Sequence, residues 1–92
     1  MYVILVYDIV LDEGGARVSR NIFKICKKYL THVQKSVFEG DITSALLQKL
    51  KLELNAYIRK DMDSIIIFKS RDQKWLKKEF WGQEDDKTSN FF

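Results

Sequence analysis

Two uninterrupted runs of β-prone apolar residues most constrain how this chain of 92 residues can fold. The first run is Tyr2–Tyr7 and the second is Ile65–Phe68, inside the segment Ser64–Lys69. Neither run alternates between apolar and polar residues, and such runs are typical of strands that are covered on both faces. The sequence therefore predicts a sheet that needs apolar cover on two sides.

Two amphipathic patterns with helical spacing lie between the predicted strands. The apolar side of the first helix consists of Val18, Ile22, Ile25, Cys26 and Tyr29. The apolar side of the second consists of Leu47, Leu50, Leu54, Tyr57 and Ile58. Asp41 or Thr43 can cap the start of the second helix. Both helices are therefore expected to pack one side against the sheet.

The remaining segments predict two more strands. Thr31–Glu39 alternates, with Val33 and Val37 on one side and Gln34, Ser36 and Phe38 on the other. Trp75–Trp81 is half polar and predicts a strand near an edge. Two strand–helix–strand units in a chain of this length predict an α+β, ferredoxin-like (split βαβ) domain over residues 1–82. Residues 83–92 are expected to be an acidic linker and an extra C-terminal strand.

The predicted topology leaves one face of the sheet without cover. Right-handed crossovers place both helices on the same face, yet Tyr2–Tyr7 and Ile65–Phe68 put apolar side chains on the opposite face as well. Burial of apolar surface contributes about 25 cal/mol per Å². We therefore expect a homodimer joined through the sheet faces, with Phe91 and Phe92 reaching across to the partner.

Charge and cysteine content narrow the classes of function. Residues 14–81 hold fifteen Lys and Arg against seven Asp and Glu, and such a basic body suits a polyanion such as nucleic acid. The alternative is that the lysines only keep a small protein in solution. Cys26 is the only cysteine and is expected to be buried packing, so neither a disulfide nor a Cys/His metal site is predicted. The apolar start meets Asp8 too soon for a signal peptide or a membrane span, so we expect a cytoplasmic protein.

Five short segments and one arginine, taken in order, resemble the CRISPR-associated Cas-two family. Tyr7-Asp8-Ile9 resembles its YDI signature, and Arg17 stands nine residues after Asp8. Gln34–Gly40 is similar to its QxSVFxG segment, and Asp63–Phe68 to its DSxxIY strand. The segments Lys78–Gly82 and Ser89–Phe92 resemble its short late strand and its closing strand.

This resemblance implies properties that the residue patterns alone do not give. Members of the family are homodimers whose final strand joins the sheet of the partner. They act in CRISPR adaptation (spacer acquisition), where they hold integrase dimers of the Cas-one family on DNA. Some also cleave RNA or double-stranded DNA as metal-dependent endonucleases. Some relatives have Arg where this chain has His32, so a nuclease role at that position is not expected.

Asp8, at the end of a predicted strand, is the candidate metal ligand and catalytic residue, with Tyr7 and Ser36 as candidate catalytic neighbours. Mg²⁺ takes six oxygen ligands, so we expect the Asp8 residues of two subunits to share one Mg²⁺ ion, or Mn²⁺ in its place. The alternative is that Asp8 accepts backbone N–H bonds in the following turn. Tyr7 and Phe38 can simply pack in the core, and the single His32 can be packing or surface.

Four basic residues of the first helix are the candidate contacts to the phosphates of DNA or RNA. They are Arg17, Arg20, Lys24 and Lys28. The alternative is a solvated helix face, and Trp75 and Trp81 are expected to bury at the dimer contact. Three functions stay open: a DNA-binding scaffold for the integrase, which ranks first, a metal-dependent endonuclease, and an RNA-cleaving toxin-like ribonuclease of the same fold.

Overall fold

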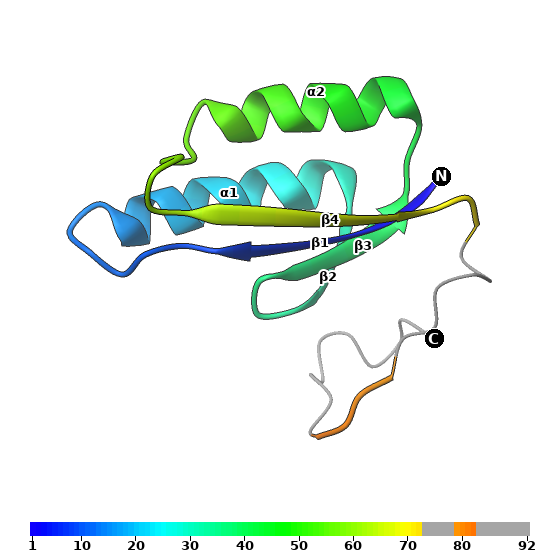
Figure 1. The fold of residues 1–92 in the computed structure, drawn as a ribbon, viewed down its shortest axis with the longest axis horizontal. Coiled ribbons are helices and arrows are strands. Elements are labelled where there is room, and N and C mark those ends of the chain that lie inside the picture. Colours follow the sequence, from blue (N-terminus) through cyan, green and yellow to red (C-terminus); the bar gives the residue numbers. More distant parts are fainter. Residues whose placement is uncertain (73–78, 83–92) are drawn as a thin grey trace.

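The computed structural model describes residues 1–72 and 79–82, and these form one antiparallel sheet with two helices (Figure 1). The strands are β1 (Tyr2–Asp8), β2 (Thr31–Gln34), β3 (Val37–Asp41) and β4 (Ser64–Ser70), and the helices are α1 (Gly15–Tyr29) and α2 (Ser44–Asn55). The strand order is β2–β3–β1–β4, and both helices lie on one face of the sheet. This arrangement is the ferredoxin-like α+β fold, as predicted. None of the described helices is both long enough and apolar enough to span a bilayer.

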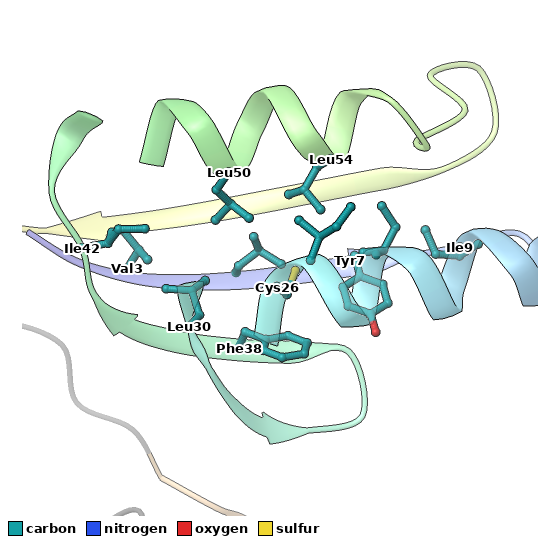
Figure 2. Packing of buried hydrophobic residues seen from close by; sticks show 12 residues of the cluster. Val3, Tyr7, Ile9, Cys26, Leu30, Phe38, Ile42, Leu50 and Leu54 are labelled. Atoms are coloured by element: carbon teal, nitrogen blue, oxygen red, sulfur yellow. The ribbon is translucent and has the colours of Figure 1, made fainter. Parts of the chain in front are cut away.

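The core lies between the sheet and the two helices (Figure 2). Because side chains of a strand alternate between faces, Val3, Leu5 and Tyr7 of β1 all enter this core. Cys26 of α1 is fully buried among them, and burial raises the pKa of its thiol to about 12. Cys26 is therefore packing, as expected.

The two helices follow their predicted apolar sides. In α1 the fully or nearly buried side chains include Ile22, Ile25 and Cys26. The side chain of Thr43 caps α2 by accepting a hydrogen bond from Leu46 N at 3.2 Å. The other candidate cap, Asp41, instead lies 3.1 Å from the N-terminal ammonium group. The cap at Thr43 fixes where the chain turns from the sheet into α2.

The prediction of one strand over Thr31–Glu39 was wrong, because this segment folds into the hairpin β2–β3. Lys35 adopts a left-handed conformation, with φ of 44°, and the chain reverses there. A register irregularity between His32 and Gln34 adds one residue to β2. Ser36 consequently lies in the turn and does not share a strand face with Phe38, which is fully buried.

The strand predicted over Ser64–Lys69 is confirmed as β4, which forms an edge of the sheet described here. Only β1 pairs with it among the described strands, and no described helix covers its outer face. Ile66 and Phe68 are 52% and 53% exposed there, opposite Val6 and Ile4 of β1. An apolar patch is thus left on the face of the sheet away from the helices.

The rest of this face is not bare, which corrects the expectation that one chain has nothing to cover it. Residues 79–82 lie on the side of the sheet away from the helices (Figure 1) and, with Ile4, Val37 and Glu39, line a pocket of about 270 Å³. Trp81 lies outside the described strands and is 93% exposed. Trp75, most of the strand expected at Trp75–Trp81, and the C-terminal strand expected in 83–92 lie outside the described residues.

Candidate functional site

Asp8 is the last residue of β1 and pairs with Ser64, the first residue of β4. Because alternate residues of β1 face the same way, Asp8 lies on the sheet face that carries Val6 and Ile66, away from the helices. Its side chain is exposed, and within residues 1–72 and 79–82 its carboxylate has no hydrogen-bond or ion-pair partner. Asp8 is therefore free to bind a ligand.

The turn that follows Asp8 is held by two other aspartates. Val10 N donates to Asp63 Oδ1 at 2.9 Å, and Gly15 N donates to the Asp12 carbonyl oxygen at 3.1 Å. Gly15 is required in this turn, because a Cβ there would lie 2.2 Å from the Val10 carbonyl oxygen. The alternative role considered for Asp8 was to accept backbone N–H bonds in the following turn, and Asp63 and Asp12 accept these bonds instead.

Arg59, in the loop between α2 and β4, joins these two aspartates. Its Nε lies 2.8 Å from Asp63 Oδ2 and its Nη1 lies 2.6 Å from Asp12 Oδ1. These bonds hold the pKa of the buried Asp63 carboxyl at about 2, below its usual value, and they raise the pKa of Arg59. The sequence analysis did not identify Arg59, and its only local signal is the spacing of four residues from Asp63.

Tyr7 and Ser36 lie at the same end of the sheet as Asp8, but the Tyr7 side chain points to the opposite face from Asp8. Tyr7 N donates to the Ser36 carbonyl oxygen at 3.1 Å, so the β2–β3 turn adjoins β1 there. The Tyr7 ring stacks on Phe38 with centroids 6.2 Å apart, and burial raises the pKa of its hydroxyl. Tyr7 therefore packs in the core on the helix side, whereas Asp8 faces the other side. Ser36 is half-buried in the β2–β3 turn at this end of the sheet.

A single chain supplies few ligands for a metal ion. Across the described ranges, 1–72 and 79–82, no three His, Cys, Asp or Glu side chains gather into a group that could hold one. The unpartnered oxygens of Asp8 suit a hard cation such as Mg²⁺, which commonly keeps several waters and takes one or two carboxylates. Within the described residues, Asp8 thus supplies one carboxylate toward such a site.

The predicted nucleic-acid contacts divide into two groups. Arg17, Arg20 and Lys24 are exposed on α1 and make no ion pair within the described part of the chain. Lys28 forms an ion pair with Glu53 of α2, which raises the pKa of Lys28. Lys28 therefore joins the two helices and is less available to a phosphate. Because α1 covers the face of the sheet opposite to Asp8, Arg17, Arg20 and Lys24 do not lie on the face that carries Asp8.

His32 is part of the hydrophobic packing around the β2–β3 hairpin. Its ring centroid lies 4.9 Å from those of Phe23 and Phe38. Its Nε2 donates to the Lys35 carbonyl oxygen at 2.7 Å, which supports the turn next to the left-handed Lys35. The packing interpretation of His32 is confirmed.

These features define a small ferredoxin-like α+β protein with a free carboxylate at one sheet end and a basic helix face. The family model for CRISPR associated protein Cas2 matches residues 1–78, and the chain belongs to that family. It is 57% identical over 91 residues to the CRISPR-associated endoribonuclease Cas2 of Fusobacterium nucleatum subsp. nucleatum, covering 99% of this chain and 86% of that protein. It is 38% identical to the Thermotoga maritima protein of the same name, with full coverage of both chains.

Solved structures agree with the sequence relatives. The crystal structure of Streptococcus pyogenes Cas2 at pH 6.5 matches with a TM-score of 0.74 and 29% identity, covering 87% of this chain and all of that one. A second structure, described as cas2, matches with a TM-score of 0.80 and 30% identity, covering 94% and 91%. The resemblance inferred from the sequence motifs is confirmed.

The low pKa of Asp63 predicts how stability depends on pH. A carboxylate whose pKa is lower in the folded state stabilises the fold above its unfolded pKa, near 3.8, and this contribution is lost as pH falls toward 2. Asp63→Asn should lower the free energy of unfolding at pH 7 by about 1–3 kcal/mol. Urea unfolding should show the difference from wild type shrinking between about pH 4 and pH 2. A difference that stays constant over this range would contradict the assignment, and Asp41→Asn, at an exposed ion pair, is the control.

Proposed function

We propose that this chain acts in CRISPR adaptation as a homodimer that binds nucleic acid and scaffolds the Cas-one integrase. We further propose that the dimer is a metal-dependent endonuclease on RNA or double-stranded DNA. The observation that carries the proposal is the position of Asp8, a free carboxylate on the same sheet face as the exposed Ile66 and Phe68. One face thus offers both a contact surface and a cation ligand.

The apolar patch of β4 supports a symmetric dimer. Ile66 and Phe68 are adjacent on one face of an edge strand, and each is about half exposed. In an isologous contact the same patch lies on both subunits, so two copies cover four such side chains at about 25 cal/mol per Å² buried. The sequence of β4, apolar on both faces, fits a strand that a second subunit covers.

The same contact supports a shared ion at Asp8. Because Asp8 lies on the face that would meet the partner, a two-fold axis through this face brings two Asp8 carboxylates toward one another. A bound Mg²⁺ or Mn²⁺ supplies Lewis-acid stabilisation of the charge that develops on a phosphodiester. The residues of this chain would bind that ion through Asp8 and hold the β1 end in place through the Val10–Asp63 hydrogen bond. Ser36 lies at the same sheet end as a candidate polar contact.

The names of the relatives support the choice of chemistry. The Fusobacterium nucleatum and Thermotoga maritima proteins are both named endoribonucleases, so phosphodiester cleavage in RNA is the activity that we propose first. Arg17, Arg20 and Lys24 of α1 offer binding to the phosphate backbone without reading of sequence.

A specific observation also favours a scaffold that does not cleave. The α1 helix carries no acidic residue, and its free cations lie on the side of the sheet opposite to Asp8. Nucleic acid can therefore bind to α1 without reaching Asp8. The match to Cas2 favours either CRISPR function over a toxin-like ribonuclease, and we place the protein in the cytoplasm, where CRISPR arrays lie.

Phe68→Glu should convert the proposed dimer to a monomer. Burying one unpaired carboxylate per subunit should raise the dimer dissociation constant about 100-fold or more, equivalent to at least about 2.7 kcal/mol. Sedimentation equilibrium should show about 22 kDa for wild type and 10.9 kDa for the variant. Leu52→Glu is the matched control, because Leu52 is also an exposed apolar side chain, 65% exposed, but lies on α2. An unchanged Phe68→Glu dimer would place the interface elsewhere.

Replacing Arg17, Arg20 and Lys24 with Gln should weaken nucleic-acid binding and reduce its dependence on salt. Each lost duplex phosphate contact removes about 0.9 from the slope of log affinity against log salt, so the slope should fall by about 2–3. Fluorescence anisotropy at several salt concentrations measures this slope. The control replaces Lys49, Lys51 and Lys60 with Gln, which removes the same charge from α2 and the loop after it. Equal effects in both variants would show only a general charge effect.

Asp8→Asn should abolish divalent-dependent cleavage and leave the dimer and its nucleic-acid affinity nearly unchanged. Asn keeps the size and one oxygen but loses the charge that a hard cation requires. Gel assays on labelled RNA and duplex DNA, with Mg²⁺ or Mn²⁺ at neutral and alkaline pH, measure cleavage, and Asp41→Asn is the control. Wild type that cleaves nothing would reject the nuclease proposal. The scaffold proposal would then depend on whether the Asp8→Asn dimer still binds its integrase.

A further inference from the structure

Beyond Asp8, the ordinary backbone pairing of β1 with β4 ends, and side chains take its place. The final pair in the register is Asp8 with Ser64. Two residues later, Val10 N donates to Asp63 Oδ1 at 2.9 Å, and the Val10 carbonyl oxygen accepts from Arg59 Nη2 at 3.0 Å. The Val10 N–H is thus satisfied by a side chain of the loop before β4, and the Val10 carbonyl oxygen accepts from Arg59 together with Asp12 N, which lies 3.0 Å from it. Past Asp8, hydrogen bonds from the Arg59–Asp63 pair to Val10 thus take the place of further backbone hydrogen bonds between β1 and β4.

Arg59 is the centre of this arrangement because it contacts three groups at once. Its Nε and Nη2 form a two-point contact with the Asp63 carboxylate, at 2.8 and 3.0 Å. Its Nη1 reaches Asp12 at 2.6 Å, across 47 residues of sequence. The side chain of Asp63 is fully buried and that of Arg59 is 22% exposed, so this pair is more shielded from solvent than an ordinary surface ion pair.

We propose that Arg59 is a positioning residue for Asp8, which it holds in place through Val10 and Asp63. This inference rests on the proposed function of Asp8 as a metal ligand. On one side of Asp8 the backbone is fixed by β1 pairing, and on the other side by the Arg59–Asp63 contact to Val10. The carboxylate of Asp8 makes no contact of its own in the described residues, so only its backbone sets its direction. A ligand shared across a two-fold axis requires a fixed direction in both subunits.

Arg59 has a second effect, which is to occupy two neighbouring carboxylates. Asp12 and Asp63 flank the segment after Asp8, and both accept hydrogen bonds from the guanidinium. A carboxylate paired with a guanidinium is a poor ligand for a divalent cation. Pairing by Arg59 therefore keeps these two aspartates from competing with Asp8 for the ion.

The test compares Arg59→Lys with wild type in the full chain. Lys keeps the positive charge but has one donor nitrogen, which cannot span Asp12, Asp63 and the Val10 carbonyl oxygen together. We expect kcat for RNA cleavage with Mn²⁺ to fall at least tenfold, with KM changed less than threefold. Hydrogen exchange at the Val10 amide should speed up at least tenfold, while exchange at the Leu5 amide in mid-β1 stays unchanged.

Two further variants keep the result interpretable. Asp41→Asn removes the ion pair with the N-terminal ammonium at the opposite end of β1, so it should change neither kcat nor Val10 exchange. Asp12→Asn removes only the contact between Arg59 Nη1 and the Asp12 carboxylate. It is the variant to test if Arg59→Lys does not fold. It should lower kcat in the same direction by a smaller factor, about threefold or more.

The outcomes separate this inference from the proposed function. Faster Val10 exchange with unchanged kcat would show a purely structural role and overturn the inference, as would unchanged Val10 exchange. Wild type without any cleavage would reject the nuclease proposal itself. The inference would then be judged on the NMR order parameters of the Asp8 and Val10 amides. A decrease in Arg59→Lys, but not in Asp41→Asn, would support positioning of Asp8, and unchanged values would overturn it.

Discussion

β1 is hydrogen-bonded along both edges, to β3 on one side and to β4 on the other, and this double pairing determines where every functional group points. Val3, Leu5 and Tyr7 are directed into the core, so Val6 and Asp8 must face the opposite side. A shift of one residue in register would bury Asp8 and expose Tyr7. The direction of the candidate metal ligand is thus a consequence of core packing, which stabilises the register.

Four aspartates of this chain show how position decides what a carboxylate can do. Asp63 is buried and paired with Arg59, which lowers its pKa to about 2, and it acts as a structural acceptor. Asp12 and Asp41 are more exposed, and they form ion pairs with Arg59 and with the N-terminal ammonium group, respectively. Asp8 has no such partner in the described residues. A carboxylate without a protein partner, at the end of a rigid strand, is the one most suited to an external cation.

Local sequence patterns predicted the parts of the fold that depend on local interactions. The apolar side of α1, the Thr43 cap of α2 and the central position of β1 follow from spacing and residue type, and the structure confirms each. The hairpin turn escaped prediction because Lys35, not Gly or Asn, takes the left-handed conformation. The apolar run of β4 predicted cover on both faces, and a single chain leaves Ile66 and Phe68 on one of these faces about half exposed.

The candidate site was predictable only in part for a similar reason. Asp8 was identified from its place at a strand end and from the family motif, and the structure shows it exposed there. Tyr7 was grouped with Asp8 because both stand in the family motif Tyr7-Asp8-Ile9, yet adjacent strand residues point to opposite faces. Arg59 was missed because its contact with Asp12 joins residues 47 positions apart. No local pattern reports such a contact.

The proposed dimer connects the apolar patch of β4 with the charge of Asp8. Two carboxylates brought together on a two-fold axis repel one another, which opposes association of the subunits unless a cation lies between them. Covering Ile66 and Phe68 favours association, so the two effects act against each other on one surface. A divalent ion at the paired Asp8 residues removes the repulsion and leaves the apolar contribution. Because such coupling is reciprocal, an ion that tightens the dimer must also bind more tightly to the dimer than to a single chain, so cation affinity should rise with protein concentration.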